Sequence, residues 1–369
     1  MLSDISKFFF GKKVLISGHT GFKGSWLSIW LKHLGANVSG ISIDIPSSPS
    51  HFVVTNLSNQ IDDYRIDICD GDAVKRIVKK LQPEFVFHLA AQALVRPSYD
   101  NPIETMITNA IGSANILDAL RSLDHPVVAV MITSDKVYDN VEWVWGYREK
   151  DRLGGKDPYS ASKGMAELAI RSFVDSFFSS PDSNVRVAVT RAGNVIGGGD
   201  WAVDRIVPDC MNSWSNNEVV DIRNPDATRP WQHILEPLRG YLFLAAQLST
   251  TRSLHGEAYN FGPHAHQNQS VRELINAMSS HWDSVRWNDI SNSKAHLHEA
   301  GLLKLNCDKA LFDLQWQPIL EFRETVLMTV EWYRHYYQNS AESMYNFTIS
   351  QIEEYTRIAS ARDLPSREV

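Results

Sequence analysis

The sequence predicts an α/β protein with a doubly wound parallel Rossmann sheet and a smaller C-terminal α/β lobe. Short, apolar, β-branched segments alternate with amphipathic segments through the first half of the 369 residues. That alternation is typical of a parallel sheet covered by helices on both faces. A glycine-rich turn also lies directly between the first expected strand and the first expected helix, which is typical of this fold.

The expected elements follow one another without a long gap as far as residue 193. We expect strands at 14–16, 38–43, 85–87, 127–132 and 185–190, and helices at 22–34, 73–81, 103–123 and 159–178. Gly35 closes the first of these helices, and Pro83 follows the end of the second. Beyond residue 193 glycine, proline and tryptophan interrupt the pattern, and we expect helices at 207–214, 235–248, 271–280 and 322–336.

This pattern divides the chain into three parts. Residues 1–192, with a returning segment near 230–262, form the expected Rossmann domain. Residues 193–229 and 263–340 form the smaller lobe, and 341–369 form a C-terminal tail with a weak helical signal.

Composition excludes several classes of protein. The chain carries 36 basic and 43 acidic residues, a net charge of −7, which is not the basic footprint that duplex nucleic acid needs. No window approaches the roughly 20 apolar residues of a membrane-spanning helix, and the first residues lack a signal peptide's apolar stretch. The three cysteines have no short spacing, which argues against a disulfide framework or a metal site. We therefore expect a cytoplasmic protein that binds neither nucleic acid, membrane nor metal.

The glycine-rich turn predicts a dinucleotide site. It consists of Gly18, Gly21, Phe22, Lys23 and Gly24, with His and Thr after the first glycine. Glycines there leave room for a pyrophosphate to rest against backbone N–H groups, and the helix N-terminus adds partial positive charge. Such glycines alone are a weak signal, but the strand before them and the helix after them favour cofactor binding over a plain turn.

Further cofactor contacts are expected where later strands end. Asp44 follows the second strand, twenty positions after Gly24. A carboxylate there accepts hydrogen bonds from an adenosine ribose and repels a 2′-phosphate, so NAD is favoured over NADP. A solvated loop aspartate is the alternative. The remaining expected contacts are the adenine neighbours Asp67 and Ile68, at the end of a further strand expected between the second strand and the helix at 73–81, the third along the chain, and the strand end Leu89, Ala90 and Ala91.

Tyr159 and Lys163 form the expected catalytic pair, and both also contact the cofactor. Their i, i+4 spacing places them on one face of a helix. A free phenol has a pKa of about 10, but a neighbouring ammonium and a positive nicotinamide ring favour the phenolate. The pair can then take a proton from a substrate hydroxyl while hydride leaves for NAD. Such a pair alone is usually a surface feature; beside the glycine turn it indicates catalysis.

These motifs together resemble the extended short-chain dehydrogenases/reductases that act on sugar nucleotides. The resemblance is carried by the glycine turn and by segments 88–91, 133–138 and 159–163. Segments 95–99, 190–201 and 229–233 are most similar to the CDP-glucose 4,6-dehydratase branch, which opens dideoxyhexose synthesis. The resemblance implies a lyase that converts CDP-glucose to CDP-4-dehydro-6-deoxyglucose and water. In such enzymes NAD oxidises the hexose at C4, water is eliminated across C5–C6, and hydride returns to C6.

The resemblance also implies roles for three residues at one strand end. Ser134 holds the C4 oxygen beside Tyr159, and Asp135, protonated in a dry pocket, donates to the departing C6 hydroxyl. Lys136 stands where dTDP-glucose and GDP-mannose dehydratases carry a glutamate that acts as the C5 base. It is either a base with a depressed pKa or a charged group that stabilises the enolate while water or Tyr159 moves the proton. A strand-end Asp–Lys pair that merely caps a loop is the remaining alternative.

The substrate's diphosphate requires local positive charge in an acidic protein. Arginine suits this task because its planar fork holds two oxygens at once. Family members also pair through the helix that carries the catalytic tyrosine, so we expect a homodimer or homotetramer. The expected substrate-binding residues are Arg96, Ser98, Asn194, Trp201, Arg205 and Arg229.

Two other functions fit the same fold. A sugar-nucleotide 4-epimerase would share Tyr159 and Lys163, but it would not need Asp135 next to Ser134. A non-catalytic NAD-binding sensor would be expected to lose the tyrosine or the lysine, and this chain has both.

Overall fold

The computed structural model describes residues 2–291, 302–338 and 343–362. Seven strands form one sheet in the order β11-β6-β5-β4-β1-β2-β3, and every pairing in it is parallel. The predicted doubly wound parallel sheet is therefore confirmed. The strands are β1 (Lys13–Ser17), β2 (Asn37–Ser42), β3 (Asp62–Arg65), β4 (Phe85–His88), β5 (Val127–Ile132), β6 (Val185–Ala192) and β11 (Ala258–Phe261).

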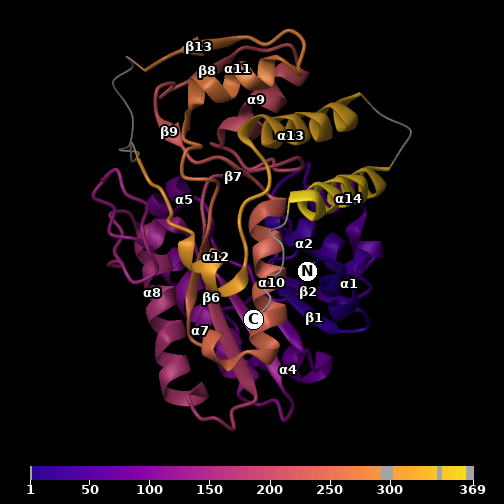
Figure 1. The fold of residues 1–369 in the computed structure, drawn as a ribbon, viewed down its shortest axis with the longest axis vertical. Helices are drawn as coiled ribbons and strands as arrows, with labels where there is room; N and C mark the ends of the chain where they lie inside the picture. Colours follow the sequence, from indigo (N-terminus) through magenta and orange to yellow (C-terminus); the bar gives the residue numbers. More distant parts are fainter. Residues whose placement is uncertain (1, 292–301, 339–342, 363–369) are drawn as a thin grey trace.

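The sheet has a separate hydrophobic core on each face, because alternate side chains of a strand point to opposite faces. Val14 and Ile16 of β1 join the core that contains α2 (Phe22–His33) and α10 (Leu235–Thr250). Leu15 between them joins the other core, beneath α4, α7 and α8. Figure 1 shows these helices around the strands. Burial on both faces explains why the central strands are apolar throughout.

The helices largely follow the predicted ranges. The helix expected over 103–123 is divided into α6 and α7 by a π-helical turn over 107–111, and a second π turn follows α8. The other helices are α1 (Leu2–Phe9), α3 (His51–Val54), α4 (Gly71–Leu81), α5 (Val95–Asp100), α6 (Pro102–Met106), α7 (Gly112–Leu120), α8 (Pro158–Phe173), α9 (Ile206–Ser215), α11 (Val271–Ser279), α12 (Asp308–Leu314), α13 (Phe322–Tyr337) and α14 (Met344–Arg362). In the part of the chain that the structure describes, no helix is both long and apolar enough to cross a membrane.

A smaller set of elements lies beyond one end of the sheet (Figure 1). It contains α9, α11 and three two-stranded pairs, of which only β9 with β12 is antiparallel. Helix α13 packs against α9 and α11. The short strands are β7 (Val195–Ile196), β8 (Val220–Ile222), β9 (Thr228–Arg229), β10 (Gln232–His233), β12 (Gln269–Ser270) and β13 (Trp287–Asp289).

Helix α14 packs on α2 and α13, so the end of the chain covers part of its beginning. His51 lies at this junction, where its ring stacks on Trp26. Its Nδ1 is 2.8 Å from the Ser25 hydroxyl, and its Nε2 is 3.2 Å from the hydroxyl of Thr348 in α14. Residues 341, 342 and 363–369 of the expected tail lie outside the described residues.

The position of the third strand differs from the prediction. Strand β3 ends at Arg65, two residues before Asp67. It lies at the edge of the sheet, where only β2 pairs with it. Its sequence Asp-Asp-Tyr-Arg is polar because this edge is partly exposed, so it lacks the apolar signal of the buried strands.

Candidate active site

The candidate site lies along the carboxyl edge of the sheet. Because the strands are parallel, the segments after β1, β2, β4, β5 and β6 all emerge at this edge. They carry Gly18, Asp44, Leu89, Ser134 and Gly193 respectively. Ligands of open parallel sheets bind at this edge, so the fold alone brings the predicted cofactor and catalytic segments together.

The glycine turn fits a dinucleotide pyrophosphate. Gly18 has a φ of +78°, and a Cβ placed on it would lie 2.6 Å from the backbone nitrogen of Ala90. A Cβ on Gly24 would lie 2.1 Å from the carbonyl oxygen of Gly18. Helix α2 begins directly after Gly21, and no side chain caps that end. The turn is therefore as tight as this kind of anion cradle requires, and only glycine fits at Gly18 and Gly24.

The predicted adenosine contacts lie on either side of this turn. The carbonyl of Asp44 accepts a hydrogen bond of 2.7 Å from the Thr20 hydroxyl, which holds the end of β2 against the turn, and the Asp44 residue is exposed. The carboxylate of Asp67 accepts a 2.8 Å hydrogen bond from the backbone nitrogen of Cys69. Ile68 is buried. Their roles toward the cofactor stay predictions.

Ser134, Asp135 and Lys136 form a compact turn after β5. The Ser134 hydroxyl donates to Oδ1 of Asp135 at 3.0 Å and accepts from the backbone nitrogen of Lys136 at 3.2 Å. The Ser134 side chain also lies near enough to the Tyr159 phenol to lower its pKa. Ser134 and Asp135 are buried, and Lys136 is half-buried. The phenol, the hydroxyl and the carboxylate predicted to act together are thus close to one another.

The start of α8 fixes the position of Tyr159. Asp157 caps the helix by accepting a 2.9 Å hydrogen bond from the nitrogen of Ser160. The backbone nitrogen of Tyr159 donates to the Ser98 hydroxyl at 3.2 Å, and that hydroxyl donates to the carbonyl of Val95. Ser98, predicted from the sequence to bind substrate, therefore also anchors the helix that carries Tyr159.

Burial changes the proton affinities of the catalytic pair. Burial raises the pKa of Tyr159, an effect opposed by the nearby Ser134 side chain and by the charge of Arg205. Burial lowers the pKa of Lys163 to about 8; the charge of Lys23 adds to this and Glu167 opposes it. The phenol is therefore protonated at neutral pH in the protein alone, and the phenolate expected from the sequence needs an additional positive charge nearby.

Lys23 lies closer to the chemistry than the sequence suggested. Burial lowers its pKa to about 8, as does the charge of Arg205, while Asp135 and Asp200 act in the opposite direction. Its ammonium is thus in the electrostatic field of the catalytic carboxylate as well as at the predicted cofactor turn. No spacing pattern in the sequence links Lys23 to Asp135.

Arginines from three segments gather beside α9. Arg205 forms an ion pair of 3.1 Å with Asp200. Arg96 and Arg223 both pair with one carboxylate, that of Asp204, at 2.7 and 3.2 Å. The sequence predicted Arg96 and Arg205 but missed Arg223, which lies directly after the short strand β8.

The other predicted substrate residues lie on nearby segments. Arg229 of β9 donates to the carbonyl of Thr228 at 2.8 Å. Asn194 follows β6 with a φ of +50°. Trp201 packs edge-on against aromatic rings of α13, and its N–H donates to the Tyr337 hydroxyl at 3.2 Å. This packing offers a structural role for Trp201 beside the predicted sugar contact.

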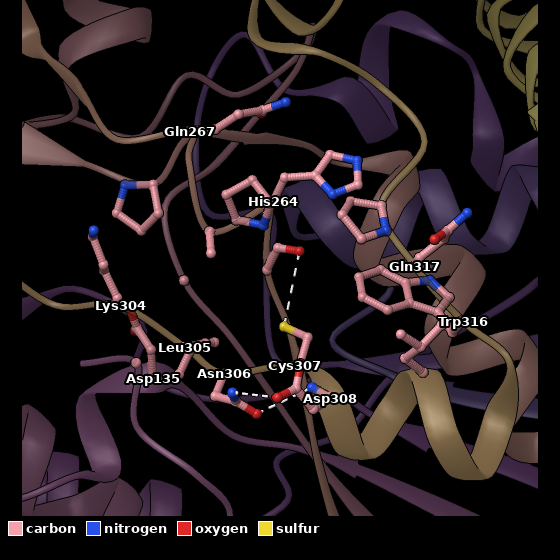
Figure 2. A pocket seen from close by; sticks show the side chains of 18 of the residues that line it. Asp135, His264, Gln267, Lys304, Leu305, Asn306, Cys307, Asp308, Trp316 and Gln317 are labelled. Carbon is pink, nitrogen blue, oxygen red and sulfur yellow. Dashed lines mark hydrogen bonds between the residues drawn. The ribbon is translucent and has the colours of Figure 1, made fainter.

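A cavity of about 390 Å³ opens next to the catalytic turn. Its lining includes Asp135, Gly193, His264, Gln267 and Lys304, and Figure 2 shows the side chains of Asp135, His264, Gln267 and Lys304 around it. The glycine turn and Tyr159 are not among its lining residues. Among the described residues, no group of three or more histidine, cysteine or acidic side chains could hold a metal ion.

The Rossmann sheet, its glycine turn and the Ser134, Tyr159 and Lys163 cluster define an extended short-chain dehydrogenase/reductase. A family model described as GDP-mannose 4,6 dehydratase matches residues 15–329, so the chain belongs to that family. This membership confirms the predicted class of enzyme, a nucleotide-sugar 4,6-dehydratase that works with NAD.

Individual relatives agree with this assignment. The chain is 46% identical to CDP-glucose 4,6-dehydratase of Salmonella typhimurium, covering 89% of this chain and 92% of that protein. It is 24% identical to human dTDP-D-glucose 4,6-dehydratase, with the same coverage. Among solved structures, the epimerase Mth375 of Methanothermobacter thermautotrophicus has a TM-score of 0.75 at 24% identity and covers 92% of this chain and 98% of its own. At that identity the likeness concerns the fold alone.

Proposed function

We propose that this protein converts CDP-glucose to CDP-4-dehydro-6-deoxyglucose and water. The observation that carries the proposal is the hydrogen bond of Ser134 with Asp135, beside the Tyr159 phenol whose pKa Ser134 lowers. A proton donor is thereby held beside the group that takes the proton of the C4 hydroxyl. The choice of CDP-glucose rests on the Salmonella relative, which is 46% identical.

The first half of the reaction is oxidation at C4. The glycine turn with Gly18 and Gly24 would hold NAD, which would supply an acceptor for the C4 hydride and a donor of hydride to C6. Tyr159 removes the proton of the C4 hydroxyl, and the Ser134 hydroxyl holds that oxygen. Because burial raises the pKa of Tyr159, the phenolate forms only when positive charge is close. Lys163, whose pKa of about 8 leaves it mostly charged at pH 7, contributes to that charge.

The second half is elimination of water. The new C4 carbonyl acidifies the C5 proton, and loss of this proton expels the C6 hydroxyl, which takes a proton from Asp135 and leaves as water. Lys136 either accepts the C5 proton or stabilises the enolate with its charge. Lys136→Glu separates these roles, because retained elimination identifies a base and complete loss identifies a positive charge.

The nucleotide end of the substrate binds beside α9. Arg205 and Arg229 bind the diphosphate, and Asn194 contributes a polar contact from the loop after β6. Arg96, Ser98 and Trp201 border the hexose. Apart from Arg96 and Ser98, NAD is assigned to residues 1–192 with 230–262, and the nucleotide sugar to 193–229 and 263–340.

A second copy of the chain covers the outer face of α8 and of α6 with the π-helical turn that continues it. Ile103, Ile107, Ile111 and Leu168 there are 44% to 67% exposed although they are large and apolar. Isolated apolar side chains on a surface are common, but a row along two neighbouring helices indicates an interface. We expect Leu168→Asp to convert a homodimer or homotetramer to a smaller species in sedimentation.

The test of the function offers the purified protein NAD with CDP-, UDP-, dTDP- and GDP-glucose, and identifies products by mass. We expect a product lighter by one water from CDP-glucose, with hydrogen from solvent at C5. Asp135→Asn should allow reduced nicotinamide to form but stall the elimination. A C4 epimer of the substrate, or full product formation by Asp135→Asn, would exclude the proposed mechanism. The cytoplasm, where NAD and nucleotide sugars meet, is the proposed location.

A further inference from the structure

The turn that carries Ser134, Asp135 and Lys136 has an anchor at each end. Thr133 precedes the turn, and Tyr138 ends it. Both side chains are buried, and neither was predicted to take part in the chemistry. Their partners explain how the turn is held.

Thr133 and Tyr138 both hydrogen-bond to one buried ion pair, formed by Arg191 of β6 and Glu167 of α8. The two side chains are only 4% and 5% exposed, and the guanidinium binds the carboxylate through Nε and Nη2, with Nε 2.7 Å from Oε1. Glu167 lies one helical turn after Lys163. The pair therefore links the catalytic helix to the strand next to β5.

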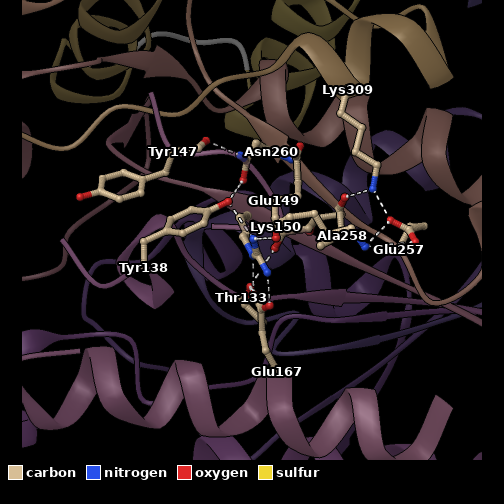
Figure 3. Close-up of polar contacts among 12 residues, drawn as sticks. Thr133, Tyr138, Tyr147, Glu149, Lys150, Glu167, Glu257, Ala258, Asn260 and Lys309 are labelled. Carbon is tan, nitrogen blue, oxygen red and sulfur yellow. Dashed lines mark hydrogen bonds and ion pairs between the residues drawn. The ribbon is translucent and has the colours of Figure 1, made fainter. Parts of the chain in front are cut away.

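Each half of the ion pair holds one end of the turn (Figure 3). The Thr133 hydroxyl donates to Oε1 of Glu167 at 2.7 Å. Nη1 of Arg191 donates to the Tyr138 hydroxyl at 2.7 Å, and that hydroxyl donates to Oδ1 of Asn260 at 2.8 Å. The turn is thus tied at both ends to a single rigid unit that also positions the helix of Tyr159.

Asn260 links Tyr138 to residues that line the cavity. Its backbone nitrogen donates to the Glu149 carboxylate at 2.9 Å. Its side-chain nitrogen donates to the carbonyls of Tyr147 and Asn306 at 2.9 and 3.1 Å. Asn306 lines the 390 Å³ cavity beside Asp135. One residue thus connects the end of the catalytic turn to the wall behind it.

The energetics of such an arrangement favour a fixed geometry. A buried ion pair contributes little net stability relative to apolar packing, but breaking it leaves an uncompensated buried charge. Buried hydrogen bonds also strengthen one another where water is excluded. The turn therefore cannot shift without breaking several satisfied contacts at once.

We propose that Tyr138, Arg191 and Asn260 are positioning residues that hold Asp135 and Lys136 at the hexose for elimination. This inference rests on the proposed dehydratase function. During the oxidation Tyr159 and Ser134 act on the C4 hydroxyl, and Tyr159 has its own anchor in Ser98. Loosening the far end of the turn should therefore slow the elimination more than the oxidation.

The test compares Tyr138→Phe with Tyr259→Phe. Each variant removes one hydroxyl from a fully buried tyrosine, but the Tyr259 hydroxyl bonds to Asp313, away from the turn. In single-turnover experiments with CDP-glucose, Tyr138→Phe should slow elimination about tenfold or more, since a shift of 1 Å can cost 10²-fold. Reduced nicotinamide should then accumulate, while Tyr259→Phe behaves as the unmodified protein.

A second measurement needs no substrate. Hydrogen exchange of the backbone amides of 134–138 should become faster in Tyr138→Phe than in Tyr259→Phe. The proposal is overturned if amide exchange of 134–138 is unchanged in Tyr138→Phe. It is also overturned if exchange becomes faster but the ratio of the oxidation rate to the elimination rate stays the same. If the unmodified protein fails to dehydrate any nucleotide sugar, the proposed function is wrong, and exchange alone then decides whether these residues hold the turn.

Discussion

Gly193→Ala should displace the Asp135 carboxylate while leaving the rest of the fold in place. A Cβ on Gly193 would lie 1.8 Å from Oδ2 of Asp135 and 2.1 Å from its Cγ. Ordinary contact begins at 3.4 Å, so the oxygen must move by about 1.6 Å. Since a misplacement of about 1 Å can cost 10²-fold, elimination should slow by that factor or more. The oxidation, which depends on Tyr159 and Ser134, should remain close to its normal rate.

The assay for this variant follows both halves of the reaction in one experiment. Rapid mixing with CDP-glucose and NAD reports oxidation as reduced-nicotinamide absorbance, and the 4-keto product reports elimination by its absorbance in alkali. Gly262→Ala is the matched control, because Gly262 lines the same cavity but its Cβ would meet no atom closer than 3.5 Å. Normal elimination in Gly193→Ala would refute the role of Asp135 as the proton donor.

Three further outcomes are expected. Tyr159→Phe should slow transient nicotinamide reduction by about 10² or more while CDP-glucose still binds; a normal rate would contradict its role. Gly24→Ala should weaken NAD binding in calorimetry, because its Cβ would lie only 2.1 Å from the Gly18 carbonyl oxygen. The Cβ of Gly21→Ala would lie 3.4 Å from the same oxygen, so this variant should bind NAD nearly normally. Burial lowers the pKa of His51 from 6.5 to about 3, so its imidazole stays neutral in the folded protein. In the unfolded chain the same imidazole takes up a proton below pH 6.5. The free energy of unfolding therefore falls as the pH drops from 6.5 toward 3. His51→Asn should reduce the slope of the free energy of unfolding against pH, measured in urea titrations, by up to about 1.4 kcal/mol per pH unit. An unchanged slope would show that His51 does not cause this pH dependence.

The sequence was sufficient to predict the sheet and most of its helices. Strands β1, β4 and β5 are buried on both faces, so each is a continuous apolar segment that is recognisable without a structure. The glycine turn and the Tyr159–Lys163 pair were also predictable, because a local spacing determines their geometry. Strand β3 was misplaced because an edge strand needs no such apolar pattern.

The arrangement around the catalytic turn could not be predicted in the same way. Arg191 and Glu167 are 24 positions apart, and Tyr138 and Asn260 are 122 apart. Neither separation corresponds to a helical or strand period, so only the fold brings these side chains together. The one local signal was Glu167, which lies four residues after Lys163 and so shares its face of α8.

The contact between His51 and Thr348 has a consequence for how the protein is made. Thr348 lies 297 positions after His51, and α14 packs directly on α2, the helix that follows the glycine turn. While the ribosome is still translating, the emerging N-terminal half therefore has Trp26 and His51 without this covering helix. The nascent chain completes the packing around α2 only after α14 has been synthesised.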